Sequence, residues 1–290
     1  MDLSGFEPEA SSMPRSSIID ENKVKEYLNI TQLSGITNSH LYEIKRYLKH
    51  YLKYVSFKID KTKSLQYFAY LKDNYSISTY RKETYQILKF LRYLKIDWID
   101  EIKLPPDPIY TPKYIPKDMI ESTINYFKDH EYNIRFKALI CLGMDSGLRA
   151  EELYQLTSDD IDLDKQIVRI NHNPNNGQST KTKISRISFF TNTTKQILSE
   201  YLTFFNNNNT LSKLFPQRWI ERKFNSAPIK VKDLRKYFSQ EWDRRGGPTS
   251  IKKIIMGHSM KGDVDLMHYN YQSEEDLKRI YDRVMNSSIM

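Results

Sequence analysis

A proline-rich segment about a third of the way along the chain limits what the chain can fold into. Residues 104–116 read LPPDPIYTPKYIP and carry five prolines in thirteen residues. A helix cannot run through such a segment, because proline lacks an amide hydrogen and clashes with the preceding turn. We therefore expect a first domain at residues 21–103, a linker at 104–116 and a second domain at 117–290. A chain of 290 residues is long enough for two domains.

The segment before the linker is expected to be helical and basic. Apolar residues recur at three- and four-residue spacing in 38–55 and 78–95, and a further helix is expected at 61–73. Residues 38–103 contain 14 Lys or Arg against 7 Asp or Glu. Such faces can simply be solvated, but the concentration of charge favours contact with DNA. The candidate DNA-contacting residues are Lys45, Lys49, Lys53, Arg81, Lys82, Lys89 and Arg92.

The overall charge narrows the class of partner. A formal net charge of +9 and a pI of about 9.2 indicate a polyanion, with nucleic acid ahead of an anionic membrane. No apolar run approaches the roughly 18 residues of a membrane span, and the basic faces lack the apolar faces that interfacial helices need. The first residues resemble no targeting signal, so we expect a cytoplasmic, nucleoid-associated protein. Cys141, the only cysteine, excludes an internal disulfide and fits a core position.

The segment after the linker is expected to be mostly helical with one small sheet. Helices are indicated at 117–129 and 132–146. A strand at 166–170 would pair with one at 185–190 across a polar loop. The rest is helical apart from an Asn-rich break at 206–209. The expected fold class is therefore mainly α with a small antiparallel β-sheet (α+β).

Four separated motifs together resemble the catalytic domain of the tyrosine recombinases, or phage-type integrases. They are SGLRAEEL (146–153), STKTKISRISF (179–189), VKDLRKYF (231–238) and MGHSMKGDVDLMHYNYQ (256–272). Members of this family cut DNA with a tyrosine that is helped by Arg, Lys, His-x-x-Arg and a further His or Trp. The resemblance covers residues 117–290 by motif. It extends more loosely to residues 22–103, as the helical core-binding domain that clamps DNA in this family.

The resemblance assigns two arginines and an acid to the site. Arg149 in GLRAEE matches the first arginine of the family, and Arg235 in KDLR matches the second. A pentavalent phosphorane carries extra negative charge, and a guanidinium can bind two of its oxygens without losing its proton. Glu152, on the same helical face as Arg149, matches the supporting acid. Its simpler interpretation is an exposed helix acid.

The resemblance also places a lysine on the hairpin between the two strands. Counting back from Arg186, which stands where the family has a basic residue entering the second strand, Lys181 matches the lysine that protonates the leaving 5′ oxygen. Lys183 is the alternative, because this hairpin is longer than the common GKG form. Lys232 stands where the family usually has a histidine. An ammonium can bind phosphate but is a poor proton acceptor at neutral pH, so its role as a general base stays open.

The last motif supplies a histidine and two candidate nucleophiles. His258 lies 23 residues after Arg235, and the resemblance makes it a hydrogen-bond donor to the scissile phosphate. A Gly-His pair can also be just a helix end. The usual family spacing falls at Met267, and the KGD insertion favours Tyr269 as the nucleophile, with Tyr271 as the packing tyrosine and the alternative. A tyrosine hydroxyl is a weak nucleophile at neutral pH, so nearby cations must stabilise its phenolate.

The activity implied by the resemblance is site-specific DNA recombination. A 3′-phosphotyrosyl intermediate forms by transesterification, without a metal, ATP or other cofactor, and four protomers act in a synaptic tetramer on two duplexes. One rival is a type IB topoisomerase, which performs the same first half-reaction as a monomer. The other is a non-catalytic DNA-binding protein with the same fold, for which Lys232 and the displaced tyrosine argue.

The two ends of the chain carry separate expectations. Residues 1–20 are expected to be a disordered leader. The tetrapeptide GFEP at 5–8 can be encoded by GGN-TTC-GAA-CCN, which is compatible with the T-arm of a tRNA gene. This suggests an attachment site in such a gene for an archaeal virus or plasmid, whereas the alternative is an incidental leader. The C-terminal SEEDLKRIYDRVM begins with a capping box at Ser273 and Asp276. Its apolar face can close its own core or dock on a neighbouring subunit.

Overall fold

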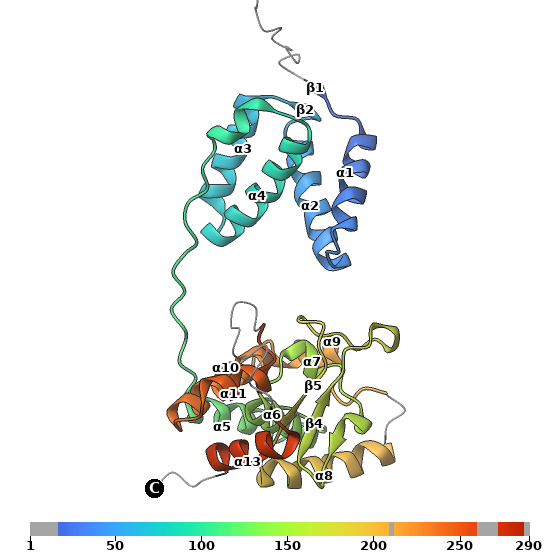
Figure 1. The fold of residues 1–290 in the computed structure, drawn as a ribbon, viewed down its shortest axis with the longest axis vertical. Helices are drawn as coiled ribbons and strands as arrows, with labels where there is room; N and C mark the ends of the chain where they lie inside the picture. Colours follow the sequence, from blue (N-terminus) through green and yellow to red (C-terminus); the bar gives the residue numbers. More distant parts are fainter. Residues whose placement is uncertain (1–16, 209–211, 260–271, 287–290) are drawn as a thin grey trace, which may run out of the picture. The chain divides into compact units, whose positions relative to one another are not determined.

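The computed structural model describes residues 17–208, 212–259 and 272–286, and the chain divides into two compact units between Thr111 and Pro112. The division falls within the proline-rich segment, which contains no helix or strand from 102 to 116. Most of the predicted leader, with its GFEP tetrapeptide, lies outside the described residues. Figure 1 shows the elements of each unit.

The first unit is built from helices, as the apolar spacing predicts. Ile44, Leu48 and Leu52 form the buried face of α2, and each is at most 2% exposed. Ile87 and Leu91 are fully buried in the same core, on α4. The helical elements are α1 (Glu21–Leu33), α2 (Asn38–Tyr54), α3 (Lys61–Asn74), α4 (Ile77–Tyr93) and the 3-10 helix η1 (Asp97–Glu101).

Two features of the first unit were not predicted. Helix α1 was missed because its sequence carries little apolar periodicity, and in the structure it buries only Tyr27. A two-residue strand, β1 (Ser17–Ile18), pairs antiparallel with β2 (Lys58–Ile59). Strands this short give no period-2 signal in the sequence.

The second unit surrounds a central helix, α6. Ten of the fourteen residues of α6 are buried, and helices α8 and α10 pack against it. Gly143 allows the close approach of α10, because a Cβ at this position would lie 2.7 Å from Cδ1 of Leu234. The helices are α5 (Lys117–Tyr126), α6 (Asn133–Ser146), α7 (Ala150–Leu153), α8 (Asn192–Asn208), α9 (Gln217–Phe224), α10 (Val231–Arg244), α11 (Thr249–Met256) and α13 (Glu274–Met285), with 3-10 turns η2 (Ser158–Asp160) and η3 (Pro174–Asn176).

A small antiparallel sheet carries the hairpin that the sequence predicts. Strands β4 (Ile167–Ile170) and β5 (Arg186–Phe189) pair with Ile170 opposite Arg186. A third strand, β3 (Ile161–Asp162), pairs with β4 and was not predicted. The expected fold class, mainly α with a small antiparallel sheet, is confirmed. Cys141 is buried in the core of this unit, as its apolar surroundings indicate.

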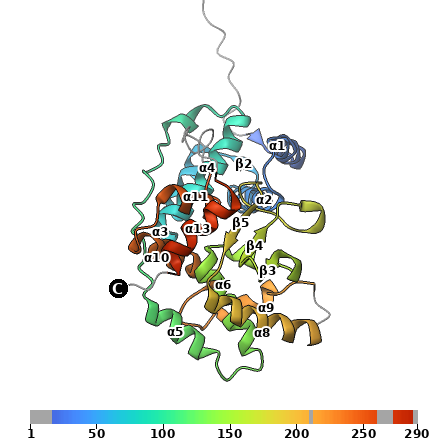
Figure 2. The same ribbon diagram turned by 60° about the horizontal axis from the view of Figure 1, so that its bottom comes forward.

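The C-terminal helix α13 packs against its own unit, beside β5 and α11 (Figure 2). Ser273 caps it through a bond from the amide of Asp276, at 3.1 Å. Tyr281 is fully buried and donates its hydroxyl to the carbonyl of Asp145 at 3.0 Å. Arg245 of the segment after α10 donates to the carbonyl of Met285 at 2.8 Å. Helix α13 thus closes the core of its own unit, and its docking on a neighbouring subunit stays a prediction.

Within residues 17–208, 212–259 and 272–286, no helix has both the length and the apolar character that crossing a membrane requires.

Candidate active site

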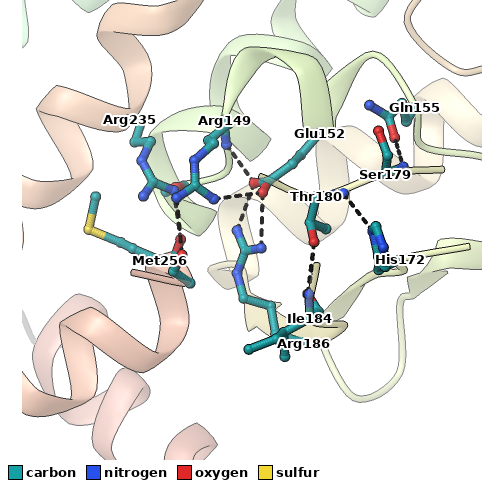
Figure 3. Close-up of polar contacts among 12 residues, drawn as sticks. Arg149, Glu152, Gln155, His172, Ser179, Thr180, Ile184, Arg186, Arg235 and Met256 are labelled. Carbon is teal, nitrogen blue, oxygen red and sulfur yellow. Dashed lines mark hydrogen bonds and ion pairs between the residues drawn. The ribbon is translucent and has the colours of Figure 1, made fainter. Parts of the chain in front are cut away.

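One buried carboxylate, that of Glu152, binds two arginines (Figure 3). Arg186 donates from Nη1 to Oε1 at 3.0 Å and from Nη2 to Oε2 at 2.7 Å. Arg149 donates from Nη1 to Oε1 and from its backbone amide to Oε2, both at 2.8 Å. The Glu152 side chain is only 2% exposed. The alternative of an exposed helix acid is therefore wrong, and Glu152 links the first motif to strand β5.

A sharp turn between α6 and α7 positions Arg149 and Glu152. Gly147 ends α6 in the left-handed conformation with φ at +62°, and a Cβ there would lie 2.4 Å from Phe238. Arg149 then caps α7, and Glu152 reaches back to its amide. This reach is the second half of a capping box, in which the third helical residue satisfies the amide of the cap. The spacing of three residues thus places the carboxylate beside the arginine.

The arginines keep Glu152 ionised. Burial alone would raise the pKa of this carboxyl, but the hydrogen bonds and charge of Arg186, together with those of Arg149, lower it below its ordinary value. A carboxylate with several charged donors is stable even where little water reaches it.

Arg235 extends the cluster from the first turns of α10. Its Nη1 donates to the carbonyl of Gly147 at 2.6 Å and to that of Met256 at 2.8 Å. Burial, and then the nearby charge of Arg149, lower the pKa of Arg235 to about 10, so it remains protonated at neutral pH. Among the described residues, no protein group hydrogen-bonds its Nη2. Three guanidinium groups thus lie near one carboxylate, which bonds two of them, and the cluster keeps an excess of positive charge.

His258 lies beside these arginines. It follows Gly257, which ends α11 with φ at +65° and accepts a bond from Nη2 of Arg149 at 3.0 Å. The imidazole is exposed, and partial desolvation, followed by the charges of Arg235 and Arg149, lowers its pKa. His258 is therefore neutral at pH 7, and an arriving anion would favour its protonation. The Gly-His pair ends a helix and also adjoins the cluster, and the role of His258 as a donor to the scissile phosphate stays a prediction.

The hairpin between β4 and β5 carries the two candidate lysines in a turn that follows the Asn173–Gln178 bridge. Thr180 closes the turn, because its hydroxyl exchanges bonds of 3.1 Å with the amide and carbonyl of Ile184. The amide of Thr180 donates to Nδ1 of His172 at 3.1 Å. Lys181 and Lys183 are exposed. Within the described part of the chain, neither lysine makes a hydrogen bond or ion pair with the arginine cluster.

The base of the same hairpin is anchored by Asp160. Its carboxylate accepts from the side-chain amide of Asn171 at 2.8 Å and from that of Gln178 at 3.0 Å. It also accepts from the backbone amide of Thr157 at 2.8 Å. The long polar loop is therefore an ordered platform rather than a loose connection.

The remaining predicted site residues are only partly placed. Lys232 is exposed in the first turn of α10, three residues before Arg235, so the two side chains leave the helix on the same side. It forms no hydrogen bond or ion pair with the other described residues. Tyr269 and Tyr271, the two candidate nucleophiles, lie outside the described residues.

The central role of Arg186 was not predicted from the sequence, where it served only to count back to Lys181. A signal was present, because an arginine at the start of the apolar strand RISFF needs a buried partner acid. The role of Gly257 also went unpredicted. Its position just after an apolar helix indicated only a helix end.

The predicted DNA-contacting residues of the first unit differ in their surroundings. Arg81 forms an ion pair with Asp107 at 2.8 Å, and Arg92 forms one with Asp100 at 3.1 Å. The lysines at the other predicted positions are all exposed, namely Lys45, Lys49, Lys53, Lys82 and Lys89.

Comparison with known proteins gives one family. Residues 113–275 match the model of the phage integrase family. Tyrosine recombinase XerA from Saccharolobus solfataricus is 30% identical over 212 residues, which make up 70% of this chain and 68% of that protein.

Two solved structures share the fold. A lambda integrase dimer bound to a COC′ core site aligns with a TM-score of 0.67 at 11% identity, over 88% of this chain and 98% of that one. A lambda integrase tetramer bound to a Holliday junction aligns with a TM-score of 0.66 at 10% identity, over 87% of this chain and 80% of that one.

Proposed function

The chain belongs to the phage integrase family and is a tyrosine-type site-specific DNA recombinase, and we propose that it cuts and rejoins strands through a 3′-phosphotyrosyl intermediate. The observation that supports this mechanism most is the convergence of Arg149, Arg235 and His258 in the second unit. Their motifs are far apart in the sequence. A cluster of cations with one buried carboxylate suits a phosphodiester whose negative charge increases during attack.

In the proposed reaction Tyr269 attacks the scissile phosphorus as a phenolate that the nearby cations stabilise, and the bond to the 5′ oxygen breaks. Arg149 and Arg235 stabilise the phosphorane, and His258 and Lys232 bind its nonbridging oxygens. Lys181 gives a proton to the departing 5′ oxygen. A 5′ hydroxyl of the partner strand then attacks the phosphotyrosine, returns its proton to Lys181 and displaces the Tyr269 phenolate as the diester re-forms. Because the bond energy is retained in the intermediate, the exchange needs no ATP.

The choice of nucleophile is tested with a nicked suicide duplex, on which the 5′ product diffuses away and the covalent complex accumulates. We expect Tyr269→Phe to abolish the adduct, because the ring remains but the attacking oxygen is gone. Tyr271→Phe is the matched control and should leave adduct formation near the wild-type level. An adduct that survives in the first variant and disappears in the second would transfer the role to Tyr271.

We further propose that double-stranded attachment sites, with a tRNA gene as a candidate, are the substrate. Four protomers would act on two duplexes, an assembly that the lambda integrase tetramer on a Holliday junction exemplifies. A protein with this role would associate with the nucleoid. Sequencing covalent protein–DNA junctions from cells that carry the virus or plasmid would identify the attachment site. Relaxation of supercoiled plasmids that lack any such site, by a monomer, would favour the topoisomerase alternative.

A further inference from the structure

We propose that Arg186 is a positioning residue for strand cleavage, which holds three separate pieces of the site in one arrangement. This inference rests on the proposed function and concerns how its catalytic residues are held. The three pieces are the turn that carries Arg149, the hairpin that carries Lys181 and the end of α11 that leads to His258.

The guanidinium of Arg186 uses different nitrogens for different pieces. Its two Nη atoms bind the carboxylate of Glu152 at 3.0 and 2.7 Å, and that carboxylate binds Arg149. Its Nε donates to the carbonyl of Ile255 in the last turn of α11, at 2.9 Å. One planar group thus connects α7 to α11.

The backbone of Arg186 supplies the third connection. Arg186 is the first residue of β5, opposite Ile170 of β4, and lies five residues after Lys181. A movement of its side chain would therefore disturb the end of the hairpin next to the turn that carries the proposed general acid. The hydroxyl of Thr180 closes the turn that leads from Lys181 toward Arg186, so a shift of Arg186 would reach Lys181 through few residues.

Burial makes Arg186 a positioning residue rather than a catalytic one. Its side chain is 8% exposed, compared with 19% for Arg149. Its donors face Glu152 and a helix carbonyl, so a DNA phosphate is left to Arg149, Arg235 and His258. The contribution of Arg186 to cleavage must therefore pass through the residues that it holds.

Gly257 leaves the space that this arrangement needs. A Cβ at this position would lie 2.7 Å from Nε of Arg186 and 2.8 Å from its Cζ. The carbonyl of the same glycine accepts from Nη2 of Arg149 at 3.0 Å. The residue before His258 therefore contacts both arginines that share Glu152.

Lysine cannot replace this arginine. A guanidinium presents a rigid fork that bonds a carboxylate through two nitrogens, with Nε left for a third partner, whereas an ammonium is a single point charge. Arg186→Lys keeps the positive charge beside Glu152 but loses the connection to Ile255. The substitution thus separates charge compensation from positioning.

The test compares Arg186→Lys with wild type in three measurements. These are the first-order rate of adduct formation on saturating suicide duplex, the DNA dissociation constant and the urea midpoint of unfolding. We expect the rate to fall by about tenfold or more, since small misplacements of reacting groups are costly. The dissociation constant and midpoint should stay near those of wild type. Arg169→Lys is the control, because Arg169 lies in the adjacent strand β4 and pairs only loosely with Asp162 and Glu274, at 3.8 and 3.7 Å.

A double variant covers the case in which the lysine variant folds poorly. Arg186→Met alone leaves the buried carboxylate of Glu152 with Arg149 as its single arginine partner, and Glu152→Gln in the same chain removes that negative charge. We expect the double variant to recover the unfolding midpoint relative to Arg186→Met while its cleavage rate stays low. Recovery of the rate as well would show that Arg186 only neutralises Glu152, and this would overturn the inference.

The outcomes distinguish this inference from the proposed function. If wild type and Arg169→Lys form no adduct on a mapped site, the proposed function fails and the inference fails with it. If both form the adduct and Arg186→Lys forms it at the same rate, only the positioning role is overturned.

Discussion

At the scale of single residues, Gly257 combines a backbone requirement with a packing requirement. Its φ of +65° disfavours any side chain, and a Cβ would also press on the guanidinium of Arg186. Gly246 separates the two effects, because its φ is +70° while a Cβ there would have nothing within 4 Å.

We expect Gly257→Ala to destabilise the second unit more than Gly246→Ala. Both variants incur the left-handed backbone cost of about 1 kcal/mol, but only the first crowds Arg186. Unfolding in urea is followed by the fluorescence of Trp219 and Trp242. The difference between the two midpoints measures the cost of crowding Arg186. Equal midpoints would mean that the arginine shifts aside without loss of stability.

Glu152 predicts a particular dependence of stability on pH. Because its pKa in the folded protein is below the ordinary value of 4.5, its ionised form stabilises the fold above pH 4.5. That contribution is lost as the pH falls through the lower folded-state pKa. At pH 7, Glu152→Gln should cost about 3 to 5 kcal/mol, which is typical for breaking a buried ion pair. Unfolding curves from pH 7 downward should show the gap between variant and wild type narrowing below pH 4.5. A constant gap would contradict the ionised state.

At the scale of elements, helix α13 is held at its C-terminal end by Arg245. This residue donates to the carbonyls of Val284 and Met285, at 3.3 and 2.8 Å, and its Nε pairs with Glu241. Arg244 also pairs with Glu241, but its side chain is 52% exposed. Arginine at a helix C-terminus satisfies carbonyls that have no partner within the helix.

We expect Arg245→Met to loosen α13 by about 1 to 3 kcal/mol, the usual contribution of hydrogen bonds from a charged group. Hydrogen exchange of peptides spanning 277–285 measures this directly. Arg244→Met is the matched control, because it removes an equivalent partner of Glu241 while leaving the helix end bonded. Similar loss of protection in both variants would assign the effect to Glu241 instead.

The elements also show what local patterns could and could not predict. The apolar spacing of α2 and the polar loop between β4 and β5 predicted those elements, because periodicity and turn chemistry are local properties. β3 was missed because two residues carry no alternation. The site motifs supplied Arg149, Arg235 and His258. The contact between Arg186 and Glu152 joins positions 34 residues apart, so only tertiary structure could show it.

At the scale of the whole molecule, the first unit contributes exposed lysines that suit DNA contact. Lys45, Lys49 and Lys53 recur along α2 and are exposed. For duplex DNA, each lost phosphate contact reduces the slope of log affinity against log salt concentration by about 0.9. The excess of basic residues in this unit would therefore act mainly on affinity and little on the chemistry of the second unit.

We expect the triple variant Lys45→Ala, Lys49→Ala and Lys53→Ala to bind DNA more weakly, with a shallower salt dependence. Adduct formation at saturating DNA should stay near wild type, because the substitutions leave the arginine cluster of the second unit unchanged. Lys61→Ala is the control, since Lys61 pairs with Glu101 at 2.6 Å. An unchanged salt slope would place the DNA on another face of this unit.

The carboxylate shared by Arg149 and Arg186 also restricts the order in which these residues can be substituted during evolution. Losing Arg186 first leaves a buried anion with a single partner, and losing Glu152 first leaves a buried cation beside two others. Each intermediate is penalised, whereas a simultaneous exchange for an uncharged pair need not be. Positions 152 and 186 should therefore covary among relatives. A lineage that lost one of them would be expected to show a compensating change at the other.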